Sequence, residues 1–217
     1  MRQIVAGVLA LAVAAAFAAP TRAERVKYNK GRTWNITFEA DTLGRLPANA
    51  VARGGAWSVE EDSTVPGERL LRQSEDDDGV AFHFVQFQKP LLEDVVASVR
   101  FRIASGEIDP TAGICFQLDA KGKNGYLVRV SGATGEVAFH YLIRGKRRDI
   151  RFVKVEPPAP GVWHTLAVRR QGIRLAVSYD GREVMRVREE RYSMGTVGLW
   201  TEDDTRVDFT GFEVGVP

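Results

Sequence analysis

The sequence predicts an all-β protein, a sandwich of two antiparallel sheets packed face to face. Short apolar and β-branched runs recur from Trp34 onward, and each is closed by Gly, Pro, Asn or Asp. None of these runs keeps the 3.6-residue period of a helix over ten or more residues. About fourteen such runs are too many for one small barrel, and short hairpin turns join several of them, so we expect two antiparallel sheets.

The expected strands follow one another along the chain with turn residues between them. They are 34–38, 56–59, 70–72, 80–87, 95–103, 112–119, 126–131, 136–143, 150–153, 163–170, 173–179, 182–187, 196–201 and 207–214. Three of the turns end in Gly125, Gly135 and Gly181, where a tight turn needs a positive φ, and each predicts a hairpin. The Pro-rich stretch 157–161 leads directly into the next strand and is interpreted as a loop inside one domain.

The first 23 residues predict a secretory signal peptide. Arg2 precedes an uncharged apolar run, and Thr21 and Ala23 supply the small side chains that a cleavage site needs. Cleavage after Ala23 leaves a domain of residues 24–217 with no membrane span, located in the periplasm or secreted. The composition, 44% hydrophobic and 27% charged, excludes a disordered chain and provides for one good-sized core.

Charge and cysteine content restrict the function further. Without Arg2 and Arg22 the 30 basic residues become 28, equal to the 28 acidic ones, so the mature chain is formally neutral. A neutral chain lacks the surplus of cations that phosphate binding requires, and we expect no nucleic-acid partner. Cys115 is the only cysteine, so no intrachain disulfide is available, and its apolar neighbours predict a buried, inert thiol.

Alternation along the strands predicts a polar outer face. Val99, Phe101 and Ile103 share one face of their strand and are assigned to the core, as are Ile114, Phe116 and Leu118 of the next strand. The intervening positions include polar side chains that we expect to point away from the core. They are Arg102, Gln117 and Arg129, with His140 alternating with Ala138 and Leu142. If that sheet is curved, this face forms a groove.

The stretch from Val95 to Trp200 resembles laminin-G-like domains of the concanavalin A-like lectin and glucanase superfamily. The resemblance is carried by the order of the segments VRFR (99–102), GICF (113–116), GYLVRV (125–130), GVWHTLAV (161–168), LAVSYDG (175–181) and GTVGLW (195–200), closed by FTGFEV (209–214). It implies a jelly-roll sandwich whose concave sheet binds sugars. It also implies that Trp163 is a core residue and that His164 makes hydrogen bonds at the surface.

A looser resemblance, through FEAD (38–41) and GAWSV (55–59), is to domains related to 3-keto-disaccharide hydrolases and family-16 glycoside hydrolases. Family-16 enzymes carry two glutamates around an aspartate on one strand. Here Glu107 and Asp109 begin that pattern, but Pro110 follows and the second glutamate is absent. Whether the chain is an enzyme therefore stays open.

Two charged segments receive less specific interpretations. The acidic runs 75–78 and 202–204 could supply oxygen ligands to calcium, but neither has the spacing of an EF-hand, so we assign no metal site and no cofactor and keep calcium as an open alternative. The basic run 146–148 follows Gly145 and is interpreted as the tip of a hairpin.

The sequence thus favours an exported, non-catalytic carbohydrate-binding sandwich. The predicted ligand patch uses hydrogen bonds from Arg102, Gln117, Arg129 and His140, with Trp200 or Tyr141 as a stacking ring. Two alternatives remain: a glycoside-processing enzyme related to 3-keto-disaccharide hydrolases, and a protein-interaction module of the cell envelope with a protein partner.

Overall fold

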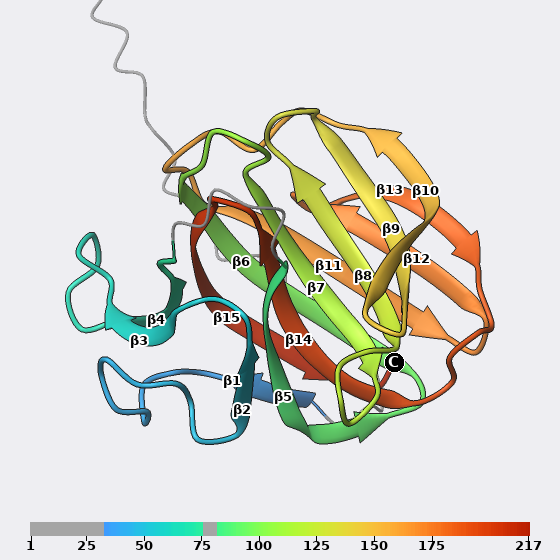
Figure 1. The fold of residues 1–217 in the computed structure, drawn as a ribbon, viewed down its shortest axis with the longest axis horizontal. Coiled ribbons are helices and arrows are strands. Elements are labelled where there is room, and N and C mark those ends of the chain that lie inside the picture. The colour runs from blue at the N-terminus through green and yellow to red at the C-terminus, as the bar shows by residue number, and fades with distance from the viewer. Residues whose placement is uncertain (1–32, 76–81) are drawn as a thin grey trace, which may run out of the picture.

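The computed structural model describes residues 33–75 and 82–217, which form two packed antiparallel β-sheets with no helix (Figure 1). The strands are β1 (Thr33–Ile36), β2 (Ala50–Arg53), β3 (Trp57–Glu61), β4 (Arg69–Gln73), β5 (Phe82–Leu92), β6 (Val95–Ser105), β7 (Thr111–Leu118), β8 (Gly125–Ser131), β9 (Glu136–Ile143), β10 (Lys146–Lys154), β11 (His164–Gln171), β12 (Arg174–Tyr179), β13 (Arg182–Arg188), β14 (Gly195–Glu202) and β15 (Arg206–Gly215). The predicted signal peptide, residues 1–23, and the expected start of a strand at Val80 lie outside the described residues.

The strand order confirms the predicted jelly-roll sandwich. Sheet A runs β13-β12-β11-β6-β15-β4-β3, with β1 also paired to β15, and sheet B runs β10-β9-β8-β7-β14-β5-β2. The chain passes from one sheet to the other at β1–β2, β2–β3, β4–β5, β5–β6, β6–β7, β10–β11, β13–β14 and β14–β15, so neither sheet is built from one continuous stretch of sequence. Since no helix occurs in the described residues, none of these residues belongs to a helix that could cross a membrane.

The hairpin turns have the backbone conformations that their residues predict. Asp180 (φ 46°) and Gly181 (φ 77°) connect β12 to β13, and Arg144 (φ 53°) and Gly145 (φ 77°) connect β9 to β10. Two successive positive φ angles define the type I′ turn, whose twist matches that of paired strands. The second turn therefore occupies only two residues. The interpretation of 146–148 as the hairpin tip is wrong, because these residues already belong to the β10 ladder.

The apolar faces of the two sheets meet in the main core. Sheet A contributes Val99, Phe101 and Ile103, as predicted, and sheet B contributes Ile114 and Phe116, all at most 3% exposed. Each buried side chain of this size contributes about 1.5–3 kcal/mol relative to an exposed one.

A second apolar cluster lies on the opposite, outer face of sheet B. It consists of Phe84, Cys115, Leu118, Leu127, Leu142 and Trp200, with Phe82 packed against it. Cys115 is fully buried, as predicted, and burial raises the pKa of its thiol far above the usual range. The thiolate is therefore not populated at neutral pH.

Leu118 is the exception to the predicted alternation. Gln117 has a φ of 50°, and the register between β7 and β14 shifts at this point, where Thr196 pairs with Leu118 but Val197 pairs with Phe116. A bulge of this kind adds one residue to one strand and resets which face the next side chain occupies. Leu118 consequently joins the outer cluster, and its assignment to the main core is wrong.

Candidate functional site

The outer face of sheet B brings polar side chains from separate strands into neighbouring rows. One row runs Gly198–Cys115–Leu127–His140–Asp149 across β14, β7, β8, β9 and β10. The adjacent row runs Trp200–Gly113–Arg129–Ala138–Phe152 across the same strands. Because paired residues point to the same face, His140, Asp149, Arg129 and Phe152 lie on one surface.

Arg129 is the centre of a charged network on this face. Its Nη1 lies 3.1 Å from Oδ2 of Asp109 and its Nε lies 3.2 Å from Oε1 of Glu202. Arg147 of β10 pairs with the other carboxylate oxygen of Glu202. The Ser131 hydroxyl donates a hydrogen bond to Asp109, which holds that carboxylate beside the guanidinium.

Glu202 is the most enclosed carboxylate of the network, with a side chain only 4% exposed. Burial raises the pKa of Glu202, while the neighbouring Arg129 and Arg147 act in the opposite direction. The two guanidiniums compensate the negative charge of this buried carboxylate as long as both remain in place. The network therefore fixes the positions of both arginines.

His140 is buried and neutral. Its Nδ1 lies 3.0 Å from Oδ1 of Asp149, and burial, together with the charges of Arg147 and Arg129, lowers the pKa of its imidazole to about 4. A neutral imidazole beside a carboxylate donates from Nδ1, which leaves Nε2 as an acceptor. Nε2 has no hydrogen-bond partner among the described residues.

Phe152 supplies an exposed aromatic ring next to this histidine. The two ring centroids are 5.5 Å apart with their planes at 81°, so the edge of one ring faces the other. Phe152 is 44% exposed, whereas His140 is 1% exposed. The Asp149 side chain, 67% exposed, makes the carboxylate side of the His140 pair accessible from solvent.

The predicted site residues are only partly brought together. Arg129 and His140 share the outer face of sheet B, as expected. Arg102 lies on the outer face of sheet A, where it pairs with Asp208 at 2.8 Å and Asp62 at 3.3 Å. The expectation that Arg102 shares a face with the other three is therefore wrong.

The bulge also removes Gln117 from the patch. Its Nε2 donates to the carbonyl oxygen of Glu93 in the β5–β6 turn at 2.7 Å, at the end of the sheet. Tyr141 pairs in register with Tyr126, packs against the main core and lies under the guanidinium of Arg191 at 4.2 Å. It therefore faces the opposite side of β9 from His140.

Trp200 does lie on the expected face but is covered. It is 1% exposed, and the rings of Phe82 and Phe84 lie 4.7 Å and 5.4 Å from it. Its surface is used in packing, and the exposed ring of this face is Phe152.

Five residues of this face are not predicted from the sequence: Asp109, Glu202, Arg147, Asp149 and Phe152. In the sequence, Asp109 belongs to an incomplete family-16 pattern and Glu202 to an acidic run without EF-hand spacing. Arg147 lies in the predicted turn, and Asp149 lies between that turn and the expected strand 150–153. A signal existed for Arg147 and Asp149, because Arg144-Gly145 fits a type I′ turn and starting the next strand at Lys146 puts both side chains on one face. Phe152 joins that face only because the register shifts between Asp149 and Arg151, which alternation alone does not predict.

The other two histidines are structural. His164 accepts the backbone N–H of Ala159 at Nε2, while Nδ1 lies 2.7 Å from Oδ2 of Asp180. Its ring packs against Phe101, whereas Trp163, assigned to the core from sequence, lies beside the guanidiniums of Arg100 and Arg102. That assignment of Trp163 is wrong. His83 is buried, with Nε2 3.1 Å from the carbonyl oxygen of Asp203.

Within the described residues, no group of three or more His, Cys, Asp or Glu side chains is placed to hold a metal ion. In the acidic run 202–204, Glu202 pairs with the two arginines and Asp204 accepts the backbone N–H groups of Glu107 and Ile108. The other acidic run, 75–78, lies mostly outside the described residues.

Comparison with known proteins shows the fold class. The carbohydrate-binding module CBM66 from Bacillus subtilis is 20% identical over 76% of this chain and 94% of its own, with a TM-score of 0.65. A protein of unknown function with a galectin-like fold, also from B. subtilis, is 12% identical over 77% and 90%, with a TM-score of 0.58. The Ca²⁺/Man2-bound exoplasmic/lumenal domain of VIP36 is 12% identical over 84% and 86%, with a TM-score of 0.59.

No family model and no curated protein matches the sequence. The similarity to the three solved structures shows that the chain has the β-sandwich fold of these lectin-like and carbohydrate-binding proteins. Sequence identities of 12–20% establish the fold alone.

Proposed function

We propose that the chain is an exported, non-catalytic carbohydrate-binding protein whose ligand lies on the outer face of sheet B, beside β10. The observation that carries this proposal is the cluster formed by Phe152, His140 and Asp149: an exposed aromatic ring next to a buried histidine whose carboxylate partner is open to solvent.

The chemistry of this cluster suits a sugar. A pyranose or furanose ring has an apolar C–H face, which packs on an aromatic ring, and an edge of hydroxyls that both donate and accept. Asp149 offers an acceptor, and Arg147 offers donors that are 26% exposed. Charge-assisted hydrogen bonds of this kind are stronger and more directional than neutral ones.

The structural relatives support the same class of ligand. One of them is a carbohydrate-binding module, and the VIP36 domain is bound to mannose-containing ligands. A fold does not fix a function, so the support lies in the combination of this fold with the polar face described above.

The test is a glycan array followed by calorimetric titration with any sugar that binds. We expect Phe152→Ala to weaken binding by about tenfold, the loss of roughly one stacking contact, with the melting temperature nearly unchanged because the ring is exposed. The matched control is Ile173→Ala, which removes an exposed apolar side chain from the β11–β12 turn. Absence of binding to every sugar, or equal effects of both variants, would overturn the proposal.

Export is tested separately. We expect the protein produced with its full N-terminus to be recovered outside the cytoplasm, beginning at Glu24. Intact-mass measurement and N-terminal sequencing of that fraction decide it, and a chain that still begins at Met1 contradicts it.

A second candidate, a glycoside-processing enzyme, is favoured by one observation. The carboxylates of Asp109 and Glu202 both contact Arg129, and burial raises the pKa of Glu202, as for the acid of a carboxylate pair. Turnover of a 3-keto-glycoside or an aryl glycoside that is abolished in Glu202→Gln, while the variant remains folded, would favour it over the binding module.

A further inference from the structure

Two turns at one end of sheet B are in direct contact. The β7–β8 turn spans residues 119–124, and the other is the two-residue turn between β9 and β10 described above. The backbone N–H of Gly145 donates to the carbonyl oxygen of Lys123 at 2.8 Å, and the N–H of Arg144 donates to Oδ1 of Asn124 at 3.0 Å. These hydrogen bonds hold the two turns side by side.

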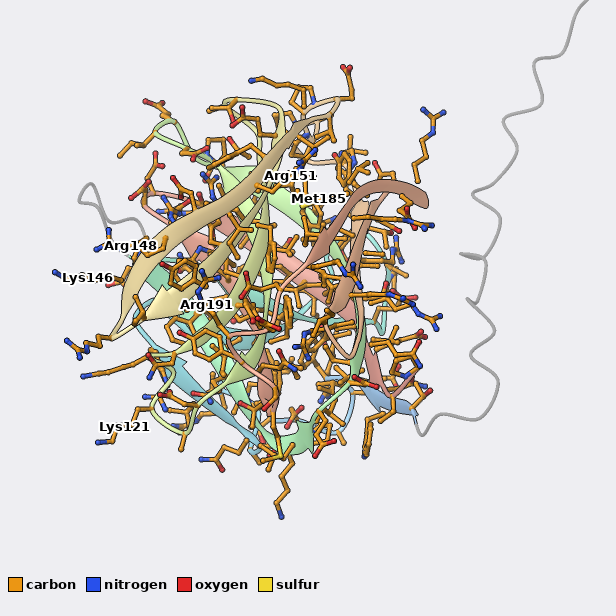
Figure 2. The ribbon with its side chains drawn as sticks, turned by 90° about the vertical axis from the view of Figure 1, so that its right-hand side faces the viewer. Lys121, Lys146, Arg148, Arg151, Met185 and Arg191 are labelled. Atoms are coloured by element: carbon orange, nitrogen blue, oxygen red, sulfur yellow. The ribbon has the colours of Figure 1, made fainter. Side chains whose placement is uncertain are left out.

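The contact between the turns gathers positive charge. Residues 119–124 and 143–148 contain six Lys and Arg and one acidic residue, Asp119. Arg147 pairs with Glu202, whereas the other five cations are exposed and form no ion pair within the part of the chain that the structure describes. These five, which we call the basic patch, are Lys121, Lys123, Arg144, Lys146 and Arg148. Figure 2 shows Lys121, Lys146 and Arg148 along the left-hand side of the molecule.

The carboxylate of Asp119 is already used within its own turn. Its Oδ1 accepts the backbone N–H groups of Lys121 and Lys123 at 3.1 and 2.8 Å. Its Oδ2 accepts the side-chain amide of Asn124 at 2.6 Å. Arg53 of β2 adds a guanidinium against the same turn, where it donates to a backbone carbonyl at 2.8 Å. Neighbouring like charges repel one another, so an anionic partner would relieve a repulsion that the free protein carries.

Protection of a sheet edge explains only part of this charge. Strand β10 is the outermost strand of sheet B, and cations on such a strand oppose pairing with another chain. Lys146 and Arg148 fit that role. Lys121 and Lys123 belong to a turn between β7 and β8, two interior strands of the sheet that have no free edge to protect. The charge of that turn therefore needs another explanation.

Ile143 places an apolar side chain among these cations. It pairs with Lys146 across the β9–β10 ladder, precedes Arg144 in the chain and is 42% exposed. By the same register, Ile143, Lys146 and Arg148 lie on one side of this ladder, opposite to Arg147. Proteins that lie at the boundary of a lipid bilayer combine these two kinds of side chain, because apolar groups enter the acyl region while cations meet the headgroups.

We propose that the basic patch docks the protein on an anionic lipid bilayer, with Ile143 inserted below the headgroups. The inference goes beyond the carbohydrate-binding function, and the patch shares no residue with the cluster of Phe152, His140 and Asp149. Each Lys or Arg close to an anionic bilayer strengthens binding by about fivefold. The burial of Ile143 adds a contribution that salt does not screen.

Ile143 is also the residue that favours a bilayer over a polyanionic chain. DNA or an acidic polysaccharide would engage the five cations but has no apolar phase to receive an aliphatic side chain. A bilayer offers both, and two turns that lie side by side can meet its flat surface together.

The first experiment measures co-sedimentation of the protein with vesicles of phosphatidylcholine and phosphatidylglycerol, beside vesicles of phosphatidylcholine alone. We expect binding to the anionic vesicles only, and a higher NaCl concentration should weaken it because exposed charges are screened. The triple variant Lys121→Gln/Lys123→Gln/Lys146→Gln should weaken this binding by about a hundredfold, at about fivefold for each charge.

The matched control is Arg174→Gln/Arg182→Gln/Arg188→Gln, which removes the same charge from exposed positions of β12 and β13 in sheet A. We expect this triple variant to bind anionic vesicles nearly as tightly as the wild type. Since both triples change the net charge equally, a difference between them locates the binding at the basic patch.

The second experiment follows the environment of position 143. Cys115 is fully buried, so Ile143→Cys provides one accessible thiol for an environment-sensitive fluorophore. We expect its emission to shift to the blue with anionic vesicles, but not with DNA or an acidic polysaccharide. The control is the same label at Ile108→Cys. Ile108 is 53% exposed in the β6–β7 connection, and the length of β7 separates it from the β7–β8 turn, so its label should stay in water.

The outcomes decide the inference separately from the proposed function. Salt-sensitive binding to anionic vesicles that only the basic-patch triple loses, with a blue shift only at position 143, supports it. Absence of binding to anionic vesicles, equal binding to pure phosphatidylcholine, or equal weakening by the two triples overturns it. Binding of DNA or an acidic polysaccharide as tight as that of the vesicles, or a label at position 143 that does not shift, also overturns it. The glycan array tests the carbohydrate-binding function independently.

Discussion

Arg147 of β10 forms an ion pair with Glu202 of β14, although three strands lie between them in sheet B. On a flat sheet, four strand spacings of about 4.8 Å would separate the two backbones by about 19 Å, further than an arginine and a glutamate side chain reach together. The contact therefore requires that sheet B curls its outer face inward. This curvature brings the edge strand β10 toward Glu202 and Arg129 on the outer face of the sheet.

Removal of the Glu202 charge should destabilise the protein strongly. Glu202→Gln keeps the side-chain volume but leaves Arg129 and Arg147 without the carboxylate that compensates them. Breaking a buried ion pair from one side costs about 3–5 kcal/mol, and we expect roughly 3 kcal/mol here because Arg147 is partly exposed. Denaturant titration measures the loss.

The control for that experiment is Glu183→Gln, which breaks the exposed pair with Arg186 on β13. Exposed pairs contribute little, so the denaturation midpoint should stay unchanged. Similar losses in the two variants would show that the network around Arg129 is not the stabilising element.

His140 should make stability depend on pH. Its pKa is about 4 in the folded protein and near 6.5 in an unfolded chain, so the unfolded state binds the proton first as the pH falls. The stabilisation is fully present above pH 6.5 and is lost progressively between pH 6.5 and 4, by about 3 kcal/mol.

The comparison that isolates this group is wild type against His140→Asn. Other carboxylates titrate in the same range in both proteins, and only the difference between them reports on His140. The free-energy difference between the two proteins should shrink by about that amount from pH 7.5 to pH 4. A constant difference, or an imidazole NMR titration near pH 6.5 in the folded protein, would contradict the assignment.

Gly195 should tolerate no side chain. A Cβ at this position would lie 2.2 Å from the backbone carbon and 2.5 Å from the Cα of Gln117, at the bulge where β14 begins against β7. Backbone cannot move aside as a flexible side chain can, so we expect Gly195→Ala to cost about 2–3 kcal/mol and to disturb the β7–β14 pairing.

Gly172 provides the comparison, since a Cβ there meets no atom within 4 Å and only its φ of 57° opposes a substitution. Gly172→Ala should therefore cost less, about 1 kcal/mol. The free energy of unfolding of each variant measures these costs. A larger loss in Gly195→Ala than in Gly172→Ala means that the steric clash outweighs the backbone strain. A smaller loss in Gly195→Ala would show that the bulge relaxes to make room for the side chain.

Cys115 should be unreactive in the native state. It is fully buried, and burial raises its thiol pKa, so neither access nor thiolate formation favours alkylation. We expect iodoacetamide to label it only in denaturant, measured by intact mass. Rapid labelling of the folded protein would contradict its place in the outer cluster with Trp200 and Leu127.

The local pattern of the sequence determined the all-β class, most strand positions, the hairpin turn at Asp180-Gly181, and the inward positions of Phe101 and Phe116. These features depend on residues that are close together in the sequence. There, alternation of apolar and polar side chains indicates a strand, and a glycine where the turn needs a positive φ indicates a hairpin. Arg129 and His140 were predicted to point away from the core for the same reason, because their strands keep strict alternation.

Only the tertiary structure decided which strands share a sheet, which positions reset the alternation and which strand ends meet. It placed Arg102 on sheet A, turned Gln117 toward Glu93 at a bulge, and brought Arg147 to Glu202 across a curved sheet. Alternation tells the two sides of one strand apart but carries no information about its neighbours. Pairing order and curvature depend instead on the packing of the whole sandwich.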